Sequence, residues 1–416
     1  GRFKLSFRIQ PDDACGPVSD GERLFLHVLR GAFSLLLVLI AAALLFRVAQ
    51  PHAFTGPGLF NFKLNPKWKD NMSYISKLMS GEIDYPPGHQ WTARAPVLFM
   101  WKNMVFWGLG LPLGMAVWAS WAYMAWELYK KEKLAHLLPW VWMTFTFLYQ
   151  STQHVKTMRY LLPIYPTAAM VAAYGLIRLW DGARAWSARR PQDGHLWVRW
   201  AAGFLILVVV LGTAFWAVAF TSIYTRPVTR IAASRWMYRN LPRGASVSWE
   251  AWDDPMPLNV DGRLASSYFD QVRMDLYAED TPEKRENLYD WIERTDYIVL
   301  SSNRLYESIP RLPMRYPMTT HYYEALFSGE LGFERLATFT SRPGLFGIEI
   351  IDDNAEEAFT VYDHPKVLIF EKSANFSMAK VRSLFEGYSL DRIVRLKPAQ
   401  VTSAPNALML SEEEWA

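Results

Sequence analysis

The residues best suited to chemistry are Lys156 and Arg159, which lie in a short polar segment directly before a long apolar run. Their spacing of three residues places both cationic groups on one face of a helical turn. Ammonium and guanidinium groups form charge-assisted hydrogen bonds with phosphate oxygens. The segment therefore predicts a lipid-phosphate site at a membrane surface, with Tyr160 beside it. The alternative is that both side chains merely extend toward lipid headgroups.

A second group of candidate binding residues precedes another apolar run and consists of His89, Trp91, Arg94 and Lys102. Histidine and arginine side chains can contact phosphate, and an indole ring offers a flat face for a sugar. Lys102 lies close to an apolar segment, where a charged group needs a partner or a cavity. The alternative is an interfacial tryptophan surrounded by solvated charges.

Other motifs carry less chemistry. The acidic turn 249–255 could bind a divalent cation or act in acid–base catalysis, although Asp-Asp-Pro more often closes a turn. The sequence contains neither a glycine-rich phosphate loop nor an HExxH motif, and its single cysteine excludes a disulfide framework. No cofactor is expected, and the sequence does not decide metal dependence. A net charge of +4 without dense basic runs argues against nucleic acid as a partner.

The composition divides the chain into an apolar part and an ordinary mixed part. The 19 Trp, 24 Phe and 20 Tyr exclude a disordered chain. Five apolar segments have about the 17–25 residues needed to cross a bilayer, so residues 24–224 are predicted to form a transmembrane domain. The predicted spans cover approximately 24–46, 103–126, 134–149, 160–177 and 200–224.

Basic residues indicate how these spans are oriented. Arginine and lysine residues concentrate in the predicted segment 1–23, between the second and third spans, and between the fourth and fifth. The positive-inside rule makes these regions cytoplasmic. It places the long loop 48–100 and everything after 224 on the outer face. Within that loop, apolar residues at helical spacing predict an amphipathic helix over 66–80, lying on the membrane or packed against the outer domain.

Residues 225–372 alternate between short strands and helices, which predicts a small extracytoplasmic α/β domain. Predicted helices cover 229–239, 281–294 and 319–326. Predicted strands cover 246–250, 297–300, 333–339, 347–351 and 367–370. Residues 373–416 are predicted to form one helix, 377–385, and a tail. The predicted fold is therefore a multi-pass α-helical membrane domain followed by an outer α/β domain.

Part of this pattern resembles a known family. The outer-loop sequence Gly88-His89-Gln90-Trp91, the motif Gly110-Leu111-Pro112, and the run from Arg159 to Pro166 after Lys156 resemble the membrane domain of the GT-C superfamily. The resemblance is to glycosyltransferase family 39, which includes the dolichyl-phosphate-mannose protein mannosyltransferases and the lipid A aminoarabinose transferases. It covers residues 48–180 and corresponds to the later part of that domain.

This resemblance implies transfer of a sugar from a polyprenyl-phosphate donor to an acceptor on the outer face of a bacterial cytoplasmic membrane. Family members activate the acceptor with an acidic residue in their first outer loop. Asp12 and Asp13 precede the first span on the cytoplasmic side and do not match that position. The chain is therefore expected to be the C-terminal part of an enzyme, with its catalytic residue elsewhere. The residues carried over bind the carrier: Lys156, Arg159, Tyr160, His89 and Arg94.

Two other functions fit the same residues. The chain could be a non-catalytic membrane subunit that anchors a larger complex and binds other subunits through its outer domain. A transporter half is a weaker alternative, because no inverted repeat is evident. A carboxylate beside Lys156 and Arg159 would favour the transferase. The expected partners are membrane lipids, the polyprenyl-phosphate-linked sugar, and either other membrane subunits or an N-terminal half of the enzyme.

Overall fold

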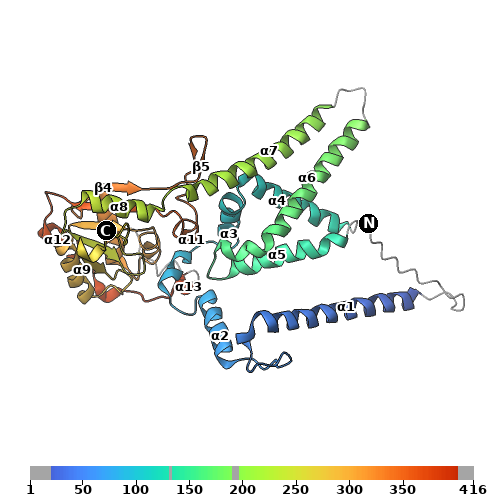
Figure 1. The fold of residues 1–416 in the computed structure, drawn as a ribbon, viewed down its shortest axis with the longest axis horizontal. Helices are drawn as coiled ribbons and strands as arrows, with labels where there is room; N and C mark the ends of the chain where they lie inside the picture. Colours follow the sequence, from blue (N-terminus) through green and yellow to red (C-terminus); the bar gives the residue numbers. More distant parts are fainter. Residues whose placement is uncertain (1–19, 131–133, 190–195, 402–416) are drawn as a thin grey trace. The chain divides into compact units, whose positions relative to one another are not determined.

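The computed structural model describes residues 20–130, 134–189 and 196–401, which form two units, Gly1–Ser76 and Lys77–Ala416 (Figure 1). Most of the predicted cytoplasmic segment 1–23 and the end of the predicted tail, 402–416, lie outside the described residues.

The first unit contains a long apolar helix and the start of the outer loop. Helix α1 spans Asp20–Ala49. The Arg47 guanidinium, near its end, donates hydrogen bonds to the carbonyls of Gly56 and Gly58 at 2.8 and 2.9 Å, which fixes the turn that follows. The predicted amphipathic helix is confirmed as α2, Pro66–Ser80, whose last four residues belong to the second unit.

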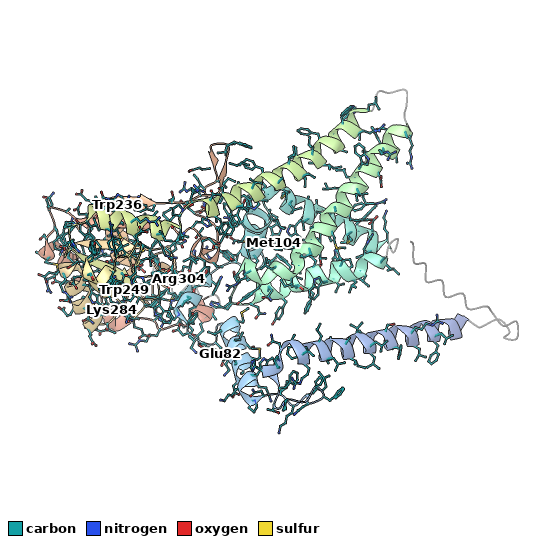
Figure 2. All side chains as sticks on the ribbon, in the orientation of Figure 1. Glu82, Met104, Trp236, Trp249, Lys284 and Arg304 are labelled. Carbon is teal, nitrogen blue, oxygen red and sulfur yellow. The ribbon has the colours of Figure 1, made fainter. Side chains whose placement is uncertain are left out.

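The second unit begins with a helical bundle, drawn in teal to green in Figure 1. Its helices surround a common apolar core that contains Met104, the bundle residue labelled in Figure 2. The longer elements are α3 (Leu98–Asn103), a π-helical turn (Met104–Gly108), α4 (Leu111–Tyr129), α5 (Leu137–Thr152), a 3-10 segment (Met158–Ile164), α6 (Tyr165–Ala188) and α7 (Leu196–Thr221).

Three helical stretches among the described residues are long and apolar enough to cross a membrane: Val28–Ala49, Met158–Ala188 and Leu196–Asn240. They overlap the first predicted span and contain the fourth and fifth. The other two predicted spans do not meet this criterion, because α5 has only 16 residues and α4 is rich in Trp and Tyr. The number of five spans therefore stays a prediction.

The predicted second span is interrupted where the sequence reads Gly110-Leu111-Pro112. Gly110 adopts φ +76° and ψ 146°, a conformation essentially restricted to glycine. A Cβ atom there would meet the Trp216 ring of α7 at 2.6 Å. Pro112 then occupies the first turn of α4, where its missing N–H costs nothing. The motif therefore breaks the helix and brings α4 against α7.

The α/β domain is built on a five-stranded sheet with the order β2-β1-β3-β7-β4. Strands β2, β1 and β3 are parallel, while β7 runs antiparallel to its neighbours β3 and β4. The strands are β1 (Ser246–Glu250), β2 (Asp270–Met274), β3 (Tyr297–Leu300), β4 (Phe333–Phe339) and β7 (Val367–Lys372). A separate two-stranded hairpin pairs β5 (Gly344–Leu345) with β6 (Ile348–Glu349).

Successive side chains of β3 and β7 point to opposite faces of this sheet, and both faces are buried. Val299 and Ile369 belong to a cluster that includes residues of α8 (Thr229–Asn240). Ile298 and Phe370 belong to the opposite cluster, which is formed with three other helices. These are α9 (Pro282–Arg294), α10 (Pro317–Ser328) and α12 (Met378–Glu386).

Most predicted elements of this domain are confirmed. The Thr281 side chain caps α9 by accepting a hydrogen bond from the Lys284 backbone N–H at 3.1 Å, as Thr-Pro-Glu predicts. The sequence analysis did not identify β2, and the predicted strand 347–351 forms only the short strand β6. The predicted C-terminal helix corresponds to α12, whose Val381 and Phe385 are part of the domain core.

The break at Gly110 generates a stability prediction. Replacement of Gly110 by Ala should destabilise the fold by about 2 kcal/mol or more, because it combines a disallowed backbone conformation with a clash against Trp216. Thermal unfolding of the detergent-solubilised protein, followed by tryptophan fluorescence, measures the effect.

Gly182→Ala is the matched control, because Gly182 lies within α6 and a Cβ there meets nothing within 4 Å. This substitution should leave the thermal midpoint unchanged or raise it, since alanine is the better helix former. Equal midpoints for the two variants would contradict the role assigned to Gly110.

Candidate functional site

The α/β domain contacts the helical bundle through the short helix α11 (Glu357–Thr360) and the residues around it. The Phe359 ring joins an aromatic cluster with Trp107, Trp216 and Phe220, at centroid separations of 5.2 to 6.5 Å. Arg304, labelled in Figure 2, pairs with Glu357 at 3.0 Å and holds this helix to the sheet edge. The loop before α11 is thereby fixed against the bundle.

Glu356 is the carboxylate that this loop delivers to the predicted phosphate segment. Its side chain is 3% exposed and accepts hydrogen bonds from the Thr157 hydroxyl at 2.8 Å and the Met158 backbone N–H at 3.0 Å. Its own backbone N–H donates to the Asn103 side-chain oxygen at 2.9 Å. Glu356 therefore binds the two residues that separate Lys156 from Arg159.

Burial raises the pKa of Glu356 to about 7, although the hydrogen bonds from Thr157 and Met158 and the nearby charge of Arg159 favour the ionised form. The neighbouring Glu357 has a pKa of about 7 for the same principal reason, offset by Arg304. Two carboxyl groups at this contact thus change charge near neutral pH.

Lys156 is a buried ammonium group without a carboxylate partner among the described residues. Its side chain is 4% exposed, and its Nζ donates one long hydrogen bond of 3.3 Å, to the His154 carbonyl. Burial lowers its pKa. Burying an unpaired charge is energetically unfavourable, so a bound anion would stabilise this site.

A second buried lysine in the same chain shows the difference. Lys284, labelled in Figure 2, binds the Asp280 carboxylate at 2.8 Å and the Thr319 hydroxyl at 2.6 Å. It also donates to the carbonyls of Leu276 and Ala278. Lys284 is a fully satisfied structural lysine, whereas the hydrogen-bonding capacity of Lys156 is mostly unused.

The other two residues of the predicted phosphate segment are more accessible. Arg159 is exposed, and its guanidinium lies 5.7 Å from the centre of the half-buried Tyr160 ring. The segment therefore presents one buried and one exposed cation, on either side of the residues that Glu356 binds.

The predicted group at the end of the outer loop is largely internal. His89 is buried, hydrogen-bonds Asp84 at 3.1 Å and lies against Tyr277 and Tyr316. Burial lowers the pKa of His89, so the ring is neutral near pH 7. Asp84 also pairs with Arg315 at 2.7 Å, and its pKa lies well below the usual range because these hydrogen bonds outweigh burial.

Trp91 is 9% exposed, and its ring meets the edge of His154. Its indole nitrogen is buried without a hydrogen-bond partner. His154 in turn bonds the Gly88 carbonyl at 3.1 Å. Trp91 and His89 are therefore buried and do not line an open surface. Trp91 contacts the segment that contains Lys156 through His154.

Arg94 has a basic neighbour that sequence reasoning did not identify. Arg94 is half-buried, donates to the Gln90 carbonyl at 3.2 Å and lies over the Phe99 ring. Burial, together with the charge of Arg311, lowers its pKa to about 10. Arg311 donates to the Thr92 carbonyl at 3.5 Å. Two guanidinium groups, Arg94 of the outer loop and Arg311 of the α/β domain, therefore lie near each other, while Lys102 is exposed.

The acidic turn after β1 has a structural explanation. Glu250 accepts a hydrogen bond from the Tyr323 hydroxyl at 2.7 Å, and Asp253 pairs with Arg230 at 3.0 Å. Within the described ranges, no cluster of three or more His, Cys, Asp or Glu side chains has the arrangement of a metal site.

Sequence reasoning also missed Glu356. Its partners Thr157 and Met158 lie about two hundred residues away in the chain, and no local pattern links them. The only signal in the sequence is the carboxylate pair Glu356-Glu357 directly before a Phe-containing turn. Comparisons with protein-family models, with curated proteins and with solved structures find no match to this chain.

The raised pKa of Glu356 generates a pH prediction. Its pKa of about 7 in the folded state exceeds the ordinary value of 4.5 for a glutamate, so the folded state retains a proton that the unfolded state releases. The contribution of Glu356 to the free energy of unfolding is therefore largest below pH 4.5, where the carboxyl group is protonated in both states. It is lost as the pH rises to about 7, because the unfolded chain then releases the proton. Glu356→Gln should match the wild type near pH 4 and have the higher thermal midpoint at pH 8.

Glu349→Gln, which changes an exposed carboxylate on β6, should leave the pH profile of the thermal midpoint unaltered. Parallel profiles for the wild type and Glu356→Gln would show that Glu356 does not titrate at this contact.

Proposed function

We propose that this chain is the C-terminal portion of an integral-membrane glycosyltransferase, which transfers a sugar from a polyprenyl-phosphate carrier to an acceptor. The observation that supports this best is the buried Lys156 ammonium, which lacks a carboxylate partner in the described structure. A phosphate oxygen is the group that would compensate its charge at an apolar boundary.

The surroundings of Lys156 suit a lipid-linked anion. The apolar stretch Met158–Ala188 begins two residues later, so a ligand held at Lys156 can leave its isoprenoid chain in the bilayer. Arg159 lies on the exposed side of the same segment. In this proposal Lys156 binds a non-bridging phosphate oxygen, and Arg159 and Tyr160 flank the headgroup.

Glu356 has a positioning role in this proposal. The hydrogen bonds from Thr157 and Met158 hold its carboxylate against the backbone of the cationic segment. It fixes the backbone between the two cations. The base that activates the acceptor is assigned to another part of the enzyme, as the resemblance to family 39 implies.

Arg94 and Arg311 form a second cationic group in this proposal. They hold adjacent positive charges, which the nearby Glu307 carboxylate partly offsets without forming an ion pair with either of them. They would attract an anionic carrier toward the outer-loop segment. The proposed location is a bacterial cytoplasmic membrane crossed five times, with the α/β domain on the extracytoplasmic side.

Replacement of Lys156 by Met tests the proposal, because Met retains the apolar stem and removes the charge. Binding of undecaprenyl monophosphate to the detergent-solubilised chain should weaken about 10- to 100-fold, since a charged hydrogen bond contributes about 1.5–3 kcal/mol. Thermal stability without ligand should stay equal or rise, because an unpaired buried charge is lost. Native mass spectrometry measures the binding, with undecaprenol as the probe that lacks phosphate.

Lys380→Met, which removes an exposed cation from α12, is the matched control and should bind as the wild type does. Equal binding of undecaprenyl monophosphate by Lys156→Met and the wild type would favour a non-catalytic membrane subunit.

A further inference from the structure

The hairpin formed by β5 and β6 exposes apolar side chains at and near its tip. Phe346, at the tip, is 89% exposed, and Ile348 is 58% exposed. Ile351, two residues after β6, is 60% exposed. Single exposed apolar residues are common on protein surfaces, but a group of large ones marks an interaction surface.

The turn of this hairpin places an aromatic side chain where the backbone conformation disfavours one. Phe346 and Gly347 connect the two strands and adopt φ values of +54° and +80°. Two-residue hairpin turns with positive φ at both positions are usually formed by Asn-Gly or Asp-Gly. A bulky residue in this conformation is strained. Because Phe346 is both strained and exposed, its side chain is better explained by a contact outside the chain than by packing within it.

The two faces of the hairpin differ in polarity. Leu345 pairs with Ile348 across the strands, and Gly344 pairs with Glu349. Cross-strand partners point to the same face of a hairpin, and successive residues point to opposite faces. Leu345 and Ile348 therefore form an apolar face, while Glu349 lies on the other face. A hairpin of this kind can lie in a membrane interface with one face toward lipid and one toward water, as amphipathic helices do.

The base of the hairpin is attached to the end of α7, which belongs to a stretch that is long and apolar enough to cross a membrane. The Gly344 backbone N–H donates a hydrogen bond to the Ser222 hydroxyl at 3.2 Å. The Arg226 guanidinium donates to the Arg342 carbonyl. Figure 1 shows β5 beside this end of α7. The hairpin is therefore fixed to the helix itself and not only to the α/β domain.

Aromatic residues indicate that this end of α7 lies at a membrane interface. Trp197 and Trp200 are exposed near the start of α7, and Tyr224 is exposed just beyond its end. Trp and Tyr concentrate at the two interfaces of a bilayer. About 20 helical residues cross the hydrocarbon core, so a span that starts at Trp200 reaches the other interface close to Phe220 and Ser222. The hairpin is thus attached at the depth of the lipid headgroups.

We propose that the β5–β6 hairpin inserts Phe346 and the face formed by Leu345 and Ile348 into the membrane interface beside the end of α7. Arg226 is exposed at the base of the hairpin and forms no ion pair with a carboxylate among the described residues, so its guanidinium can contact an anionic headgroup. The hairpin would attach the α/β domain to the bilayer itself, in addition to its contact with the helical bundle through α11. This proposal rests on α7 crossing a membrane and not on the transferase activity.

A fluorescent label on the hairpin of the full chain tests the insertion. Ile348→Cys, in a Cys15→Ser background, is labelled with NBD and reconstituted into vesicles of phosphatidylethanolamine and phosphatidylglycerol. The reference is Ser383→Cys, exposed on α12. We expect the Ile348 label to emit at shorter wavelength than the reference, to be quenched by a nitroxide-labelled phosphatidylcholine, and to be quenched several-fold less by aqueous iodide.

Two results would overturn the proposal. Equal quenching by iodide at the two positions would show that the hairpin lies in water. Protection from iodide without quenching by the nitroxide lipid would show that another protein or a second copy of the chain covers the hairpin instead of the bilayer.

Replacement of Phe346 by Asn separates the membrane contact from a structural role. Because Asn adopts positive φ readily, the thermal midpoint of the detergent-solubilised protein should stay equal or rise. In vesicles, quenching of the Ile348 label by the nitroxide lipid should fall several-fold, since the tip loses its apolar side chain. Leu264→Asn, which removes an exposed apolar side chain elsewhere in the domain, should leave this quenching unchanged. Full quenching in Phe346→Asn would contradict the role assigned to Phe346.

Discussion

The contact between Glu356 and the Thr157–Met158 segment is the interaction on which the arrangement of the second unit depends. One buried carboxylate accepts hydrogen bonds from a side chain and from a backbone N–H that begins the next helical segment. Its backbone N–H is held by Asn103 in the bundle. The position of the cationic segment is therefore set by a residue of the α/β domain, not by the membrane helices alone.

This arrangement has an electrostatic consequence. The carboxylate lies beside the backbone between Lys156 and Arg159, yet it does not neutralise Lys156, whose single hydrogen bond goes to a carbonyl. The segment is thus held by hydrogen bonds to Glu356, while its buried ammonium group has no carboxylate partner among the described residues. Satisfied networks such as Lys284–Asp280 stabilise a fold. A buried charged group without a partner, such as the Lys156 ammonium, lowers the stability of a fold. Groups of this kind are typical of binding sites.

An element of this fold could be predicted from the sequence when the residues that determine it lie close together in the chain. Helix α9 was predicted from Thr281, Pro282 and the residues that follow, because capping is decided within one turn. Strand β3 was predicted from its continuous apolar run. Strand β2 was missed because its sequence, Asp-Gln-Val-Arg-Met, is mostly polar and depends on pairing with β1. The interruption at Gly110 lies inside an uncharged run, which hydrophobicity alone reads as one continuous span.

The candidate site was only partly predictable for the same reason. The cationic segment around Lys156 is contiguous in sequence, so its residues and its apolar boundary could be identified together. Its burial, the approach of Glu356 and the pairing of Arg94 with Arg311 depend on contacts between distant segments.

Photo-crosslinking with a diazirine-labelled undecaprenyl phosphate, followed by peptide mapping, tests the central claim most directly. We predict that the label attaches within residues 154–160 and the adjoining outer loop, and that excess unlabelled undecaprenyl phosphate prevents this labelling while undecaprenol does not. Labelling spread evenly along the apolar faces of the helices, with no protection by the phosphate-bearing lipid, would contradict it.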